Sequence, residues 1–584
     1  MPISTFARVA AIVAALLAVP VVTAAAPTPC ISVGSSCFPT VQAAINAAPA
    51  GAVVAVPGGT FPGGIVIAKS LTLRGAGASK TILSGGEHVI TVGTLNAPAG
   101  SEPTVTISGI TITGGRAHDA PGSDIPGVIA VGAGILSLND AGNGGPVLTI
   151  TDSVVTGNVV SPVADFVPST PGPDWPICAD AYCRIAGALG GGLYAHGSVT
   201  IVRSSIVDNV ADGALASDAD GAGIYIQGQL AVTDSVVARN KAHVVAPNGQ
   251  FAEGGGIFAQ DGSTVSITRS SVSDNESTLQ ATWPRTNSDG TPINTLANGG
   301  GIHVDNFATV TITGSHIDGN RTSYDNPDGD WGAINAGLQM GFESRLTMTD
   351  STLSRNALSA RILTDTSGPI GGVMEWDSDA TITRSRFIGN TVTVDAVNGD
   401  ASAAAAISGL SLLTDQTDAK TVMSDSIIAG NTVTARTTTG KADVLGAGLL
   451  SQTDLTLTRV AITGNKGIAK GSGGTLLGGG IATGALLPGT RTDVLSALSL
   501  TDSVVSANAL LAPTSAVRSG GGIYSEVPVG LKRTTVAGNI PDQCVGCGAA
   551  PPTQPVLPHW HFGKFFSGRG DHSSFLDHWR LGTH

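Results

Sequence analysis

The chain has little charge and few aromatic residues for its length. Of 584 residues, 12% are charged and 4% are aromatic, and the formal net charge is −13. No basic stripe is present, which argues against nucleic acid as a partner. After residue 26, no apolar run approaches the length of a membrane-spanning helix. The composition therefore indicates neither a nucleic-acid-binding protein nor, beyond its first residues, a membrane protein.

Residues 1–26 have the form of a secretory signal peptide. Arg8 precedes an apolar stretch from Val9 to Val22, and small residues follow at 24–26. Pro20 interrupts this stretch, which is barely long enough to span a bilayer, so a signal is favoured over a membrane anchor. We therefore expect a secreted protein. Association with the cell surface stays open.

The six cysteines are three pairs of near neighbours. In an exported chain, an even number of cysteines favours local disulfides. A zinc site at the C-terminal pair is the alternative, but no second pair accompanies it. The predicted disulfides are Cys30–Cys37, Cys178–Cys183 and Cys544–Cys547.

One phrase occurs eleven times between residues 148 and 539: hydrophobic-Thr-hydrophobic-Thr-charge-Ser-x-hydrophobic-x-x-Asn. The unit is 31 to 51 residues long, with a constant core and spacers of variable length. Repeats of this length predict a solenoid, which accommodates a long chain in one domain. The repeated asparagines are Asn158, Asn209, Asn240, Asn275, Asn320, Asn356, Asn390, Asn431, Asn465, Asn508 and Asn539.

Positions within the unit alternate as on a strand. The residues three, eight and ten before each Asn are apolar or nearly always so, and we expect them to point inward. The residues seven and nine before it are mostly Thr or Ser and should face water. We expect the Asn to adopt a left-handed turn and its amide to bond to the same amide in the next coil.

Charge alternates in sign six residues before the Asn, wherever a charge exists. In a parallel stack, equivalent residues lie roughly 4.8 Å apart, so alternating charges attract where identical charges would repel. We interpret this row as a control of register, although a solvent-facing corner that accepts any charge would also explain it. The row is Asp152, Arg203, Asp234, Arg269, Gly314, Asp350, Arg384, Asp425, Arg459, Asp502 and Arg533.

Glycine runs precede most of the repeated strands, as at residues 190–192, 254–256 and 299–301. Glycine allows backbones to approach closely at a bend. A phosphate-binding loop is not indicated, because no Gly-Lys-Ser/Thr follows.

The start of the repeat region indicates a cap. Residues 40–48 are predicted to form a short amphipathic helix, followed by strands at 53–56, 65–67 and 71–73. A helix over the first coil would cover an otherwise open sheet edge. The run TVQAAINAAPAGAVVAVPGGTFPGGIVIAKSLTLRGAG at 40–77 closely resembles the opening of right-handed parallel β-helix proteins of the pectin-lyase-like superfamily. The GGGI and SxxxxN units resemble repeats of bacterial surface β-helix proteins, including the polymorphic outer-membrane type.

The resemblance covers about residues 38 to 545 and implies an all-β fold: a single-stranded right-handed parallel β-helix with a short N-terminal capping helix. Residues 27–548 would form this domain, with about a dozen coils and a length of roughly 60 Å. Residues 549–584, rich in Pro, His and aromatic residues, are expected to be a poorly ordered tail.

The spacers are the predicted binding surface. We expect all of them to follow the Asn corner and so to emerge along one edge of the solenoid. Tryptophans with charged neighbours suit sugar rings, although each Trp could equally pin its own spacer to the coil. The segment 325–330 has the composition of a calcium loop without its full spacing. The candidate binding residues are Asp174, Trp175, Trp283, Arg285, Tyr324, Asp328, Asp330, Trp331, Glu375, Trp376 and Asp377.

The β-helix scaffold hosts enzymes, adhesins and inert stalks, so the fold alone does not give the function. The resemblance to polygalacturonases would require Asn-Thr-Asp, Asp-Asp, Gly-His-Gly and Arg-Ile-Lys motifs, and none is intact. The sequence therefore favours a monomeric, noncatalytic protein that binds extracellular or cell-wall polysaccharide. We expect it to need no cofactor. Calcium is the one ion for which the sequence offers a candidate segment. A polysaccharide lyase or glycoside hydrolase, a structural stalk and a Thr-array ice-binding protein are the alternatives.

Overall fold

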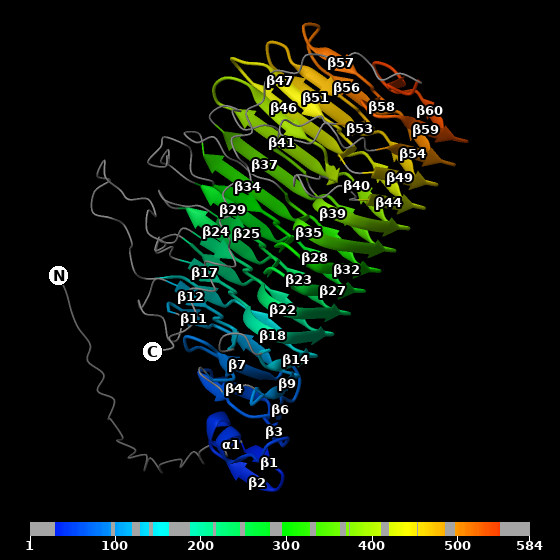
Figure 1. Cartoon of the computed structure of the whole chain (residues 1–584). Helices are drawn as coiled ribbons and strands as arrows, with labels where there is room; N and C mark the ends of the chain where they lie inside the picture. The colour runs from blue at the N-terminus through cyan, green and yellow to red at the C-terminus, as the bar shows by residue number, and fades with distance from the viewer. Residues whose placement is uncertain are drawn as a thin grey trace, which may run out of the picture.

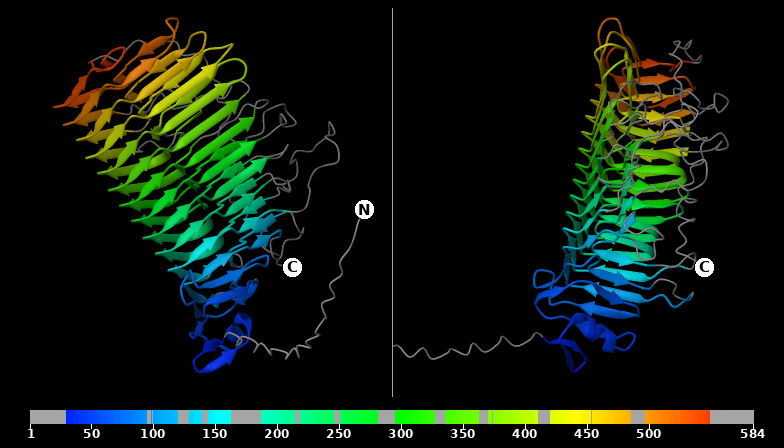
Figure 2. Two further views of the ribbon diagram at one scale, coloured as in Figure 1. Left: turned by 180° about the vertical axis from the view of Figure 1, so that it is seen from behind. Right: turned by 90° about the vertical axis from the view of Figure 1, so that its left-hand side faces the viewer.

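The protein is a solenoid of stacked parallel strands (Figure 1). The computed structural model describes residues 30–94, 98, 100–119, 129–138, 144–162, 187–213, 218–245, 251–280, 295–326, 335–362, 370–372, 374–409, 420–452, 454–484 and 497–548. Helix α1 (Val41–Ala47) lies at the N-terminal end, and the coils rise from it in chain order. Figure 2 shows the same stack from behind and from the side.

One coil shows how the repeat folds. Strand β21 (Asp218–Asp220) leads through a glycine corner into β22 (Ile224–Thr233), which pairs with its equivalents in the widest sheet, of 26 strands. The charged corner follows, then β23 (Val236–Ala238) in a 14-stranded sheet. After the Asn corner, β24 (Lys241–Val245) belongs to an 11-stranded sheet. Each sheet is therefore built from one strand, or one pair of strands, per coil.

The 14-stranded sheet shows that the stack has about two coils more than expected, because three of its strands precede the first Asn repeat. Its strands are β4 (Gly59–Pro62), β7 (Thr81–Ser84), β10 (Thr111–Thr113), β15 (Val154–Thr156), β19 (Ser205–Val207), β23, β28 (Ser271–Ser273), β33 (His316–Asp318), β36 (Thr352–Ser354), β40 (Arg386–Ile388), β45 (Ile427–Ala429), β50 (Ala461–Thr463), β55 (Val504–Ser506) and β60 (Thr535–Ala537).

Two five-stranded sheets occupy the side just before the glycine corner. The first consists of β12 (Ile129–Val131), β17 (Gly187–Leu189), β21, β25 (Phe251–Glu253) and β30 (Leu296–Asn298). The second consists of β38 (Ile370–Gly371), β42 (Ala401–Ala404), β47 (Ala442–Leu445), β52 (Thr475–Leu477) and β57 (Val517–Ser519).

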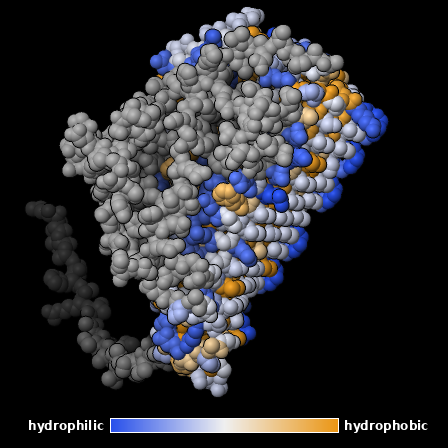
Figure 3. All heavy atoms as spheres, in the orientation of Figure 1, coloured by the Kyte–Doolittle hydropathy of each residue, from blue (hydrophilic) through white to orange (hydrophobic). Residues whose placement is uncertain are grey.

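Apolar rows fill the interior, as the repeat predicts. The residue three before each Asn is buried in ten coils, from Val155 to Val505, and the residue eight before it is buried from Ile150 to Leu500. The exceptions are in the last coil, where Leu531 is 41% exposed. The Thr positions between them are half-buried or exposed. On the outer surface, Figure 3 shows rows of intermediate hydropathy (pale) along the solenoid, edged by hydrophilic residues.

The eleven asparagines form a continuous internal ladder. Asn275 shows the pattern: its Nδ2 donates to Asn320 Oδ1 at 3.0 Å and to the Val237 carbonyl at 3.0 Å. Its Oδ1 accepts from Asn240 Nδ2 at 2.9 Å and from the Asn240 backbone N–H at 3.0 Å. The predicted bond between amides of successive coils is confirmed. A buried polar side chain is stable here because its amide groups have partners.

The prediction that Asn itself takes the left-handed turn is wrong. The residue before it does so: Asp208 has φ 58°, Arg239 has φ 54° and Gly464 has φ 66°. The Asn side chain then points inward and spans the coils, which an external corner position would not allow. The charged position is also left-handed, with φ 51° at Asp152 and 46° at Arg203.

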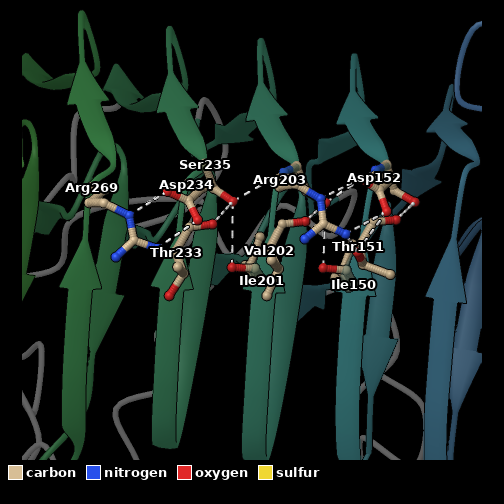
Figure 4. Close-up of polar contacts among 12 residues, drawn as sticks. Ile150, Thr151, Asp152, Ile201, Val202, Arg203, Thr233, Asp234, Ser235 and Arg269 are labelled. Carbon is tan, nitrogen blue, oxygen red and sulfur yellow. Dashed lines mark hydrogen bonds and ion pairs between the residues drawn. The ribbon is translucent and has the colours of Figure 1, made fainter.

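The alternating charges form separate ion pairs, each between an Asp and the Arg of the next coil. Figure 4 shows Arg203 with Asp152 and Arg269 with Asp234. Arg203 is bidentate, with both contacts at 2.8 Å. Hydrogen bonding from Arg203 lowers the pKa of Asp152. The other pairs in this row are Asp350–Arg384, Asp425–Arg459 and Asp502–Arg533.

Both ends of the described solenoid are closed. Helix α1 begins at the N-cap Thr40, whose Oγ1 accepts from the Ala43 N–H at 3.1 Å, and it packs on the first strands, as predicted. At the other end, Gln543 Oε1 accepts from Asn539 Nδ2 at 3.1 Å and terminates the ladder. The disulfides Cys30–Cys37 and Cys544–Cys547 are present. The third predicted pair, Cys178–Cys183, lies outside the described residues, as do residues 1–29 and 549–584.

The expectation that all spacers follow the Asn corner is wrong. Some do, such as 246–250 and 281–294, which follow strands of the 11-stranded sheet. Residues 410–419 and 485–496 instead separate two strands of the widest sheet within one coil. Insertions therefore occur at two places in the coil. In the described part of the chain, no helix has the length and hydropathy needed to cross a membrane.

Candidate functional site

Two rows of side chains flank the glycine corner. The residue that ends each strand of the first five-stranded sheet forms one row, in register from coil to coil: Val131, Leu189, Asp220, Glu253 and Asn298. The second residue of each following strand in the widest sheet forms the other, on β18 (Leu193–Val202), β22, β26 (Ile257–Ala259), β31 (Ile302–Val304) and β35 (Leu338–Thr349). This second row is Tyr194, Tyr225, Phe258, His303 and Gln339.

Glycine makes this corner possible. Gly254 has φ 57°, and a Cβ on it would lie 2.4 Å from the Ile257 carbonyl oxygen. A Cβ on Gly256 would lie 2.5 Å from the Gly301 carbonyl oxygen of the next coil. Because only glycine fits, the two rows come together at a tight bend.

The rows meet in an aromatic stack that becomes polar along the solenoid. The rings of Tyr194, Tyr225, Phe258 and His303 stack at centroid distances of 4.9, 5.0 and 5.1 Å. Leu189 packs in the same apolar cluster as Tyr225 and Phe258. Since the ring faces are occupied by neighbouring rings, these aromatic residues build the corner and do not offer flat faces to a ligand.

The polar end of the stack holds a group that we name the corner cluster: Asp220, Glu253, Gln260, Asn298, His303 and Asp305. Asn298 Nδ2 donates to Glu253 Oε1 at 2.9 Å. His303 Nε2 lies 3.0 Å from Asp305 Oδ1. Glu253, Asn298 and His303 are 5%, 3% and 6% exposed. Ionisable side chains buried to this degree are uncommon outside functional sites and ion pairs.

The cluster perturbs the protonation of its members. Burial, followed by the negative charges of Glu253, Asp218 and Asp305, raises the pKa of Asp220 well above its usual value. Burial acts to lower the pKa of His303, but Glu253 and the hydrogen bond with Asp305 outweigh it, so the His303 pKa is raised. Both shifts are in the direction that favours the protonated form of the side chain. A protonated carboxyl beside a second carboxylate is the arrangement that general acid-base chemistry uses.

Several polar atoms of the cluster have no hydrogen-bond partner among the described residues and are closed to solvent. They are Asp220 Oδ1, Gln260 Oε1, Asn298 Oδ1 and His303 Nδ1. Buried polar atoms are rarely left in this state, because each costs roughly 1–3 kcal/mol. A ligand that supplies hydrogen bonds here would recover that free energy. In the described part of the chain, no three His, Cys, Asp or Glu residues are arranged to hold a metal ion.

Next to the cluster, the turn after β31 presents an aromatic residue to solvent. Phe307 is 58% exposed and has φ 59°, a conformation that is uncommon for a bulky side chain. The Asn306 backbone N–H donates to Asp261 Oδ1 at 2.8 Å, and the Ala308 N–H donates to Ser344 Oγ at 3.1 Å. The turn is thus held on both sides of Phe307. Strain kept in place by such contacts often marks a functional position.

Most candidate binding residues predicted from the sequence lie outside the described residues: Asp174, Trp175, Trp283, Arg285, Asp328, Asp330 and Trp331. Glu375, Trp376 and Asp377 are on strand β39 (Met374–Thr383), and Glu375 is the register partner of Gln339. Glu375 therefore continues the second row by one coil.

The placement of Tyr324 in an exposed spacer is wrong. It belongs to strand β34 (Arg321–Asn326), is 1% exposed, and its hydroxyl lies 2.6 Å from Thr295 Oγ1. The strand extends past the Asn corner further than the repeat indicated, and its alternation turns Tyr324 inward. Asp325 of the calcium-like segment pairs with Arg361 at 3.1 Å.

The corner cluster was missed by sequence reasoning, although a signal was present. Asp220, Glu253 and Asn298 each stand directly before the first glycine of a corner, where Leu189 is apolar. His303 is likewise buried and is paired with Asp305. Alignment on the glycines instead of the asparagines would have placed these residues in one row.

Residues 181–444 match the family model described as a right handed beta helix region. Together with the stacked parallel strands, this establishes the molecule as a right-handed parallel β-helix. Among solved structures, the catalytic domain of a GH87 α-1,3-glucanase in complex with tetrasaccharides is similar at 11% identity and a TM-score of 0.21, over 86% of this chain and 68% of that chain. A similarity this weak gives no ground for assigning an activity. No curated protein matches the chain.

Proposed function

We propose that the protein is a secreted β-helix that binds an extracellular polysaccharide at the glycine corner, beside the corner cluster. The observation that carries this proposal is Phe307, an exposed aromatic ring on a fixed turn, two residues after Asp305. An aromatic face next to hydrogen-bonding carboxyl and amide groups is the combination that sugar rings need. A linear polymer lying along the axis would meet a new coil about every 4.8 Å.

The test is a glycan array probed with the mature protein and with a Phe307→Ala variant. We expect binding to one class of polysaccharide, weakened roughly ten-fold or more by loss of the ring, since stacking contributes on the order of 1–2 kcal/mol. The matched control is Val422→Ala, which removes another exposed apolar side chain, 44% exposed, from a distant coil. If Phe307→Ala and Val422→Ala bind alike, Phe307 does not contact the glycan.

A glycoside hydrolase is the second candidate, and the pairing of Asp220 with Glu253 favours it. These residues are register partners on adjacent coils, and the pKa of Asp220 is raised. A protonated acid and a second carboxyl group are the two parts that glycoside hydrolysis requires. Release of reducing ends from the bound glycan, abolished by Asp220→Asn, would establish this function. Binding without release leaves the noncatalytic function.

A further inference from the structure

The last coil of the described solenoid is covered only in part. Strand β61 (Cys544–Val545) pairs with β58 (Ile523–Ser525), and Ile523 and Tyr524 are 0% and 1% exposed beneath it. The next two strands, β59 (Val529–Lys532) and β60, pair with the preceding coil, and within the described residues no further strand pairs with them. A strand with one neighbour leaves a row of unpaired backbone N–H and C=O groups.

Side chains that the repeat places in the interior are uncovered at this edge. Leu531 is the register partner of Leu500, which is 1% exposed, yet Leu531 itself is 41% exposed. Val529 is half-buried, whereas its partner Leu498 is 1% exposed. An apolar edge strand of this kind is a surface onto which a further strand can bind.

The winding order of the chain shows which segment would reach this edge. In the preceding coils, β48 (Leu449–Ser451) leads to β49 (Asp454–Thr458), and β53 (Ile481–Thr483) leads to β54 (Leu498–Thr501). Strands β48, β53, β58 and β61 pair in one row, and β49, β54 and β59 pair in the other. Because β61 is the latest member of the first row, the next strand along the chain is expected to fall on β59.

The sequence after β61 contains a segment with the pattern of such a strand. In His559-Trp560-His561-Phe562, polar and aromatic residues alternate, which is typical of a half-buried strand. Residues 546–558 would link this segment to β61, and residues 484–497 form a link of similar length between β53 and β54. The segment therefore has both the position in the chain and the periodicity that the open edge requires.

We propose that residues 559–562 add a further parallel strand to β59, with Trp560 and Phe562 covering Val529 and Leu531. The two aromatic residues have the same spacing as the two aliphatic ones, so one face of the segment continues two interior rows. Backbone hydrogen bonds to β59 pair its free groups. The tail is favoured over a second molecule because it leaves the solenoid at this end and so has a high effective concentration there. This part of the tail is then ordered, unlike the expectation from sequence.

The experiment is hydrogen exchange followed by mass spectrometry on the full-length mature protein and two matched double variants. Trp560→Ser/Phe562→Ser removes the aromatic face of the segment, and His559→Ser/His561→Ser changes its opposite face. We expect slow exchange of the β59 amides in the wild type and in the histidine variant. Exchange should be roughly ten-fold or more faster in the aromatic variant, because edge amides without a partner strand open readily to solvent.

A reciprocal variant tests the contact from the side of the solenoid. Leu531→Ser removes the uncovered aliphatic side chain and should speed the exchange of residues 559–562. Val422→Ser is its control, since Val422 is 44% exposed on a distant coil and should leave that exchange unchanged. Thermal melting shows whether each variant is folded, and the reciprocal pair keeps the test decisive if the aromatic variant is not.

Fast exchange of β59 in the wild type would mean that the edge is open, which overturns the proposal. Slow exchange that both double variants retain would mean that something other than this segment covers β59. If that protection also rises with protein concentration, the edge is a contact between two copies of the chain. Equal loss of protection in both double variants would contradict the assignment of the aromatic face to the solenoid.

Discussion

At the scale of single residues, buried asparagine side chains bridge neighbouring coils. Asn320 donates from Nδ2 to Asn356 Oδ1 at 2.9 Å and to the Val272 carbonyl at 3.0 Å. Its Oδ1 accepts two bonds from Asn275. Removal of one such side chain therefore leaves buried donors and acceptors in both adjacent coils without partners.

Replacement of Asn320 by Ala is expected to destabilise the protein by about 3 kcal/mol, because several buried polar groups lose their hydrogen bonds. Gln543→Ala is the control: Gln543 accepts from Asn539 at the end of the same ladder and is exposed, so its loss should cost less. Urea denaturation followed by circular dichroism measures both. Equal urea midpoints for the two variants would show that an internal Asn contributes no more to stability than Gln543 does.

Asp443 is expected to make the stability of the folded protein depend on pH. Asp443 of β47 is 3% exposed, and burial raises its pKa to about 6 despite a hydrogen bond from the Thr475 backbone N–H. The folded state thus holds the proton more tightly than the unfolded state, so stability is greatest below the unfolded pKa and falls as pH rises through about 6. The whole effect is about 3 kcal/mol.

The Asp443→Asn variant should lose this dependence. Melting temperatures measured from pH 4 to pH 7 are expected to fall for the wild type relative to the variant, since only the wild type must bury a carboxylate at the upper end. A constant difference between the two proteins across this range would exclude Asp443 as the cause.

At the scale of the element, the glycine corner is the least substitutable part of the coil. It brings the backbone of one coil against the carbonyl groups of the next, and it holds the two rows that meet in the corner cluster. Gly256→Ala places a methyl group 2.5 Å from the Gly301 oxygen and 2.9 Å from Asn275 Nδ2.

We expect Gly256→Ala to lower stability by about 2 kcal/mol through overpacking, and to weaken glycan binding because the corner shifts. Gly548→Ala is the matched control, since a Cβ there meets nothing within 4 Å. Thermal melting and the glycan titration are measured on both. An unchanged melting temperature for Gly256→Ala would mean that the corner can relax at little cost.

The elements also show why the sequence predicted the fold better than the site. The spacing within one unit is constant, so periodicity alone assigns Ile201 to the inner row, Thr200 to the outer row and Asn209 to the ladder. Asp220 and Glu253 are separated from their Asn corners by spacers of different length, and their proximity appears only when strands pair across coils. The prediction for Tyr324 is wrong for a related reason: the end of the strand after the Asn corner is set by pairing with the next coil, which a single repeat does not encode.

At the scale of the whole molecule, each described coil covers the open edge of the one before it, and the ends need separate protection. Helix α1 provides it at the first coil, where Ile45 is 2% exposed. Undocking the helix should therefore expose strands to other molecules.

The Ile45→Asp variant is expected to self-associate, because a buried charge would displace α1 and uncover the first strands. Asn46→Asp adds the same charge on the exposed side of the helix and serves as control. Light scattering during size-exclusion chromatography gives the molar mass of each. A single mass shared by both variants and the wild type would show that α1 is not needed to block this edge.

The asparagine ladder runs in one direction, since each amide nitrogen donates toward the C-terminal neighbour and each amide oxygen receives from the N-terminal one. Gln543 ends this polarity by turning its own oxygen back onto Asn539. A molecule cut between any two coils would thus display an unanswered donor at one face and an unanswered acceptor at the other. The two fragments would be complementary to each other, and a fragment cut on both sides would grow head to tail, whereas the ladder of the described residues is closed at Gln543.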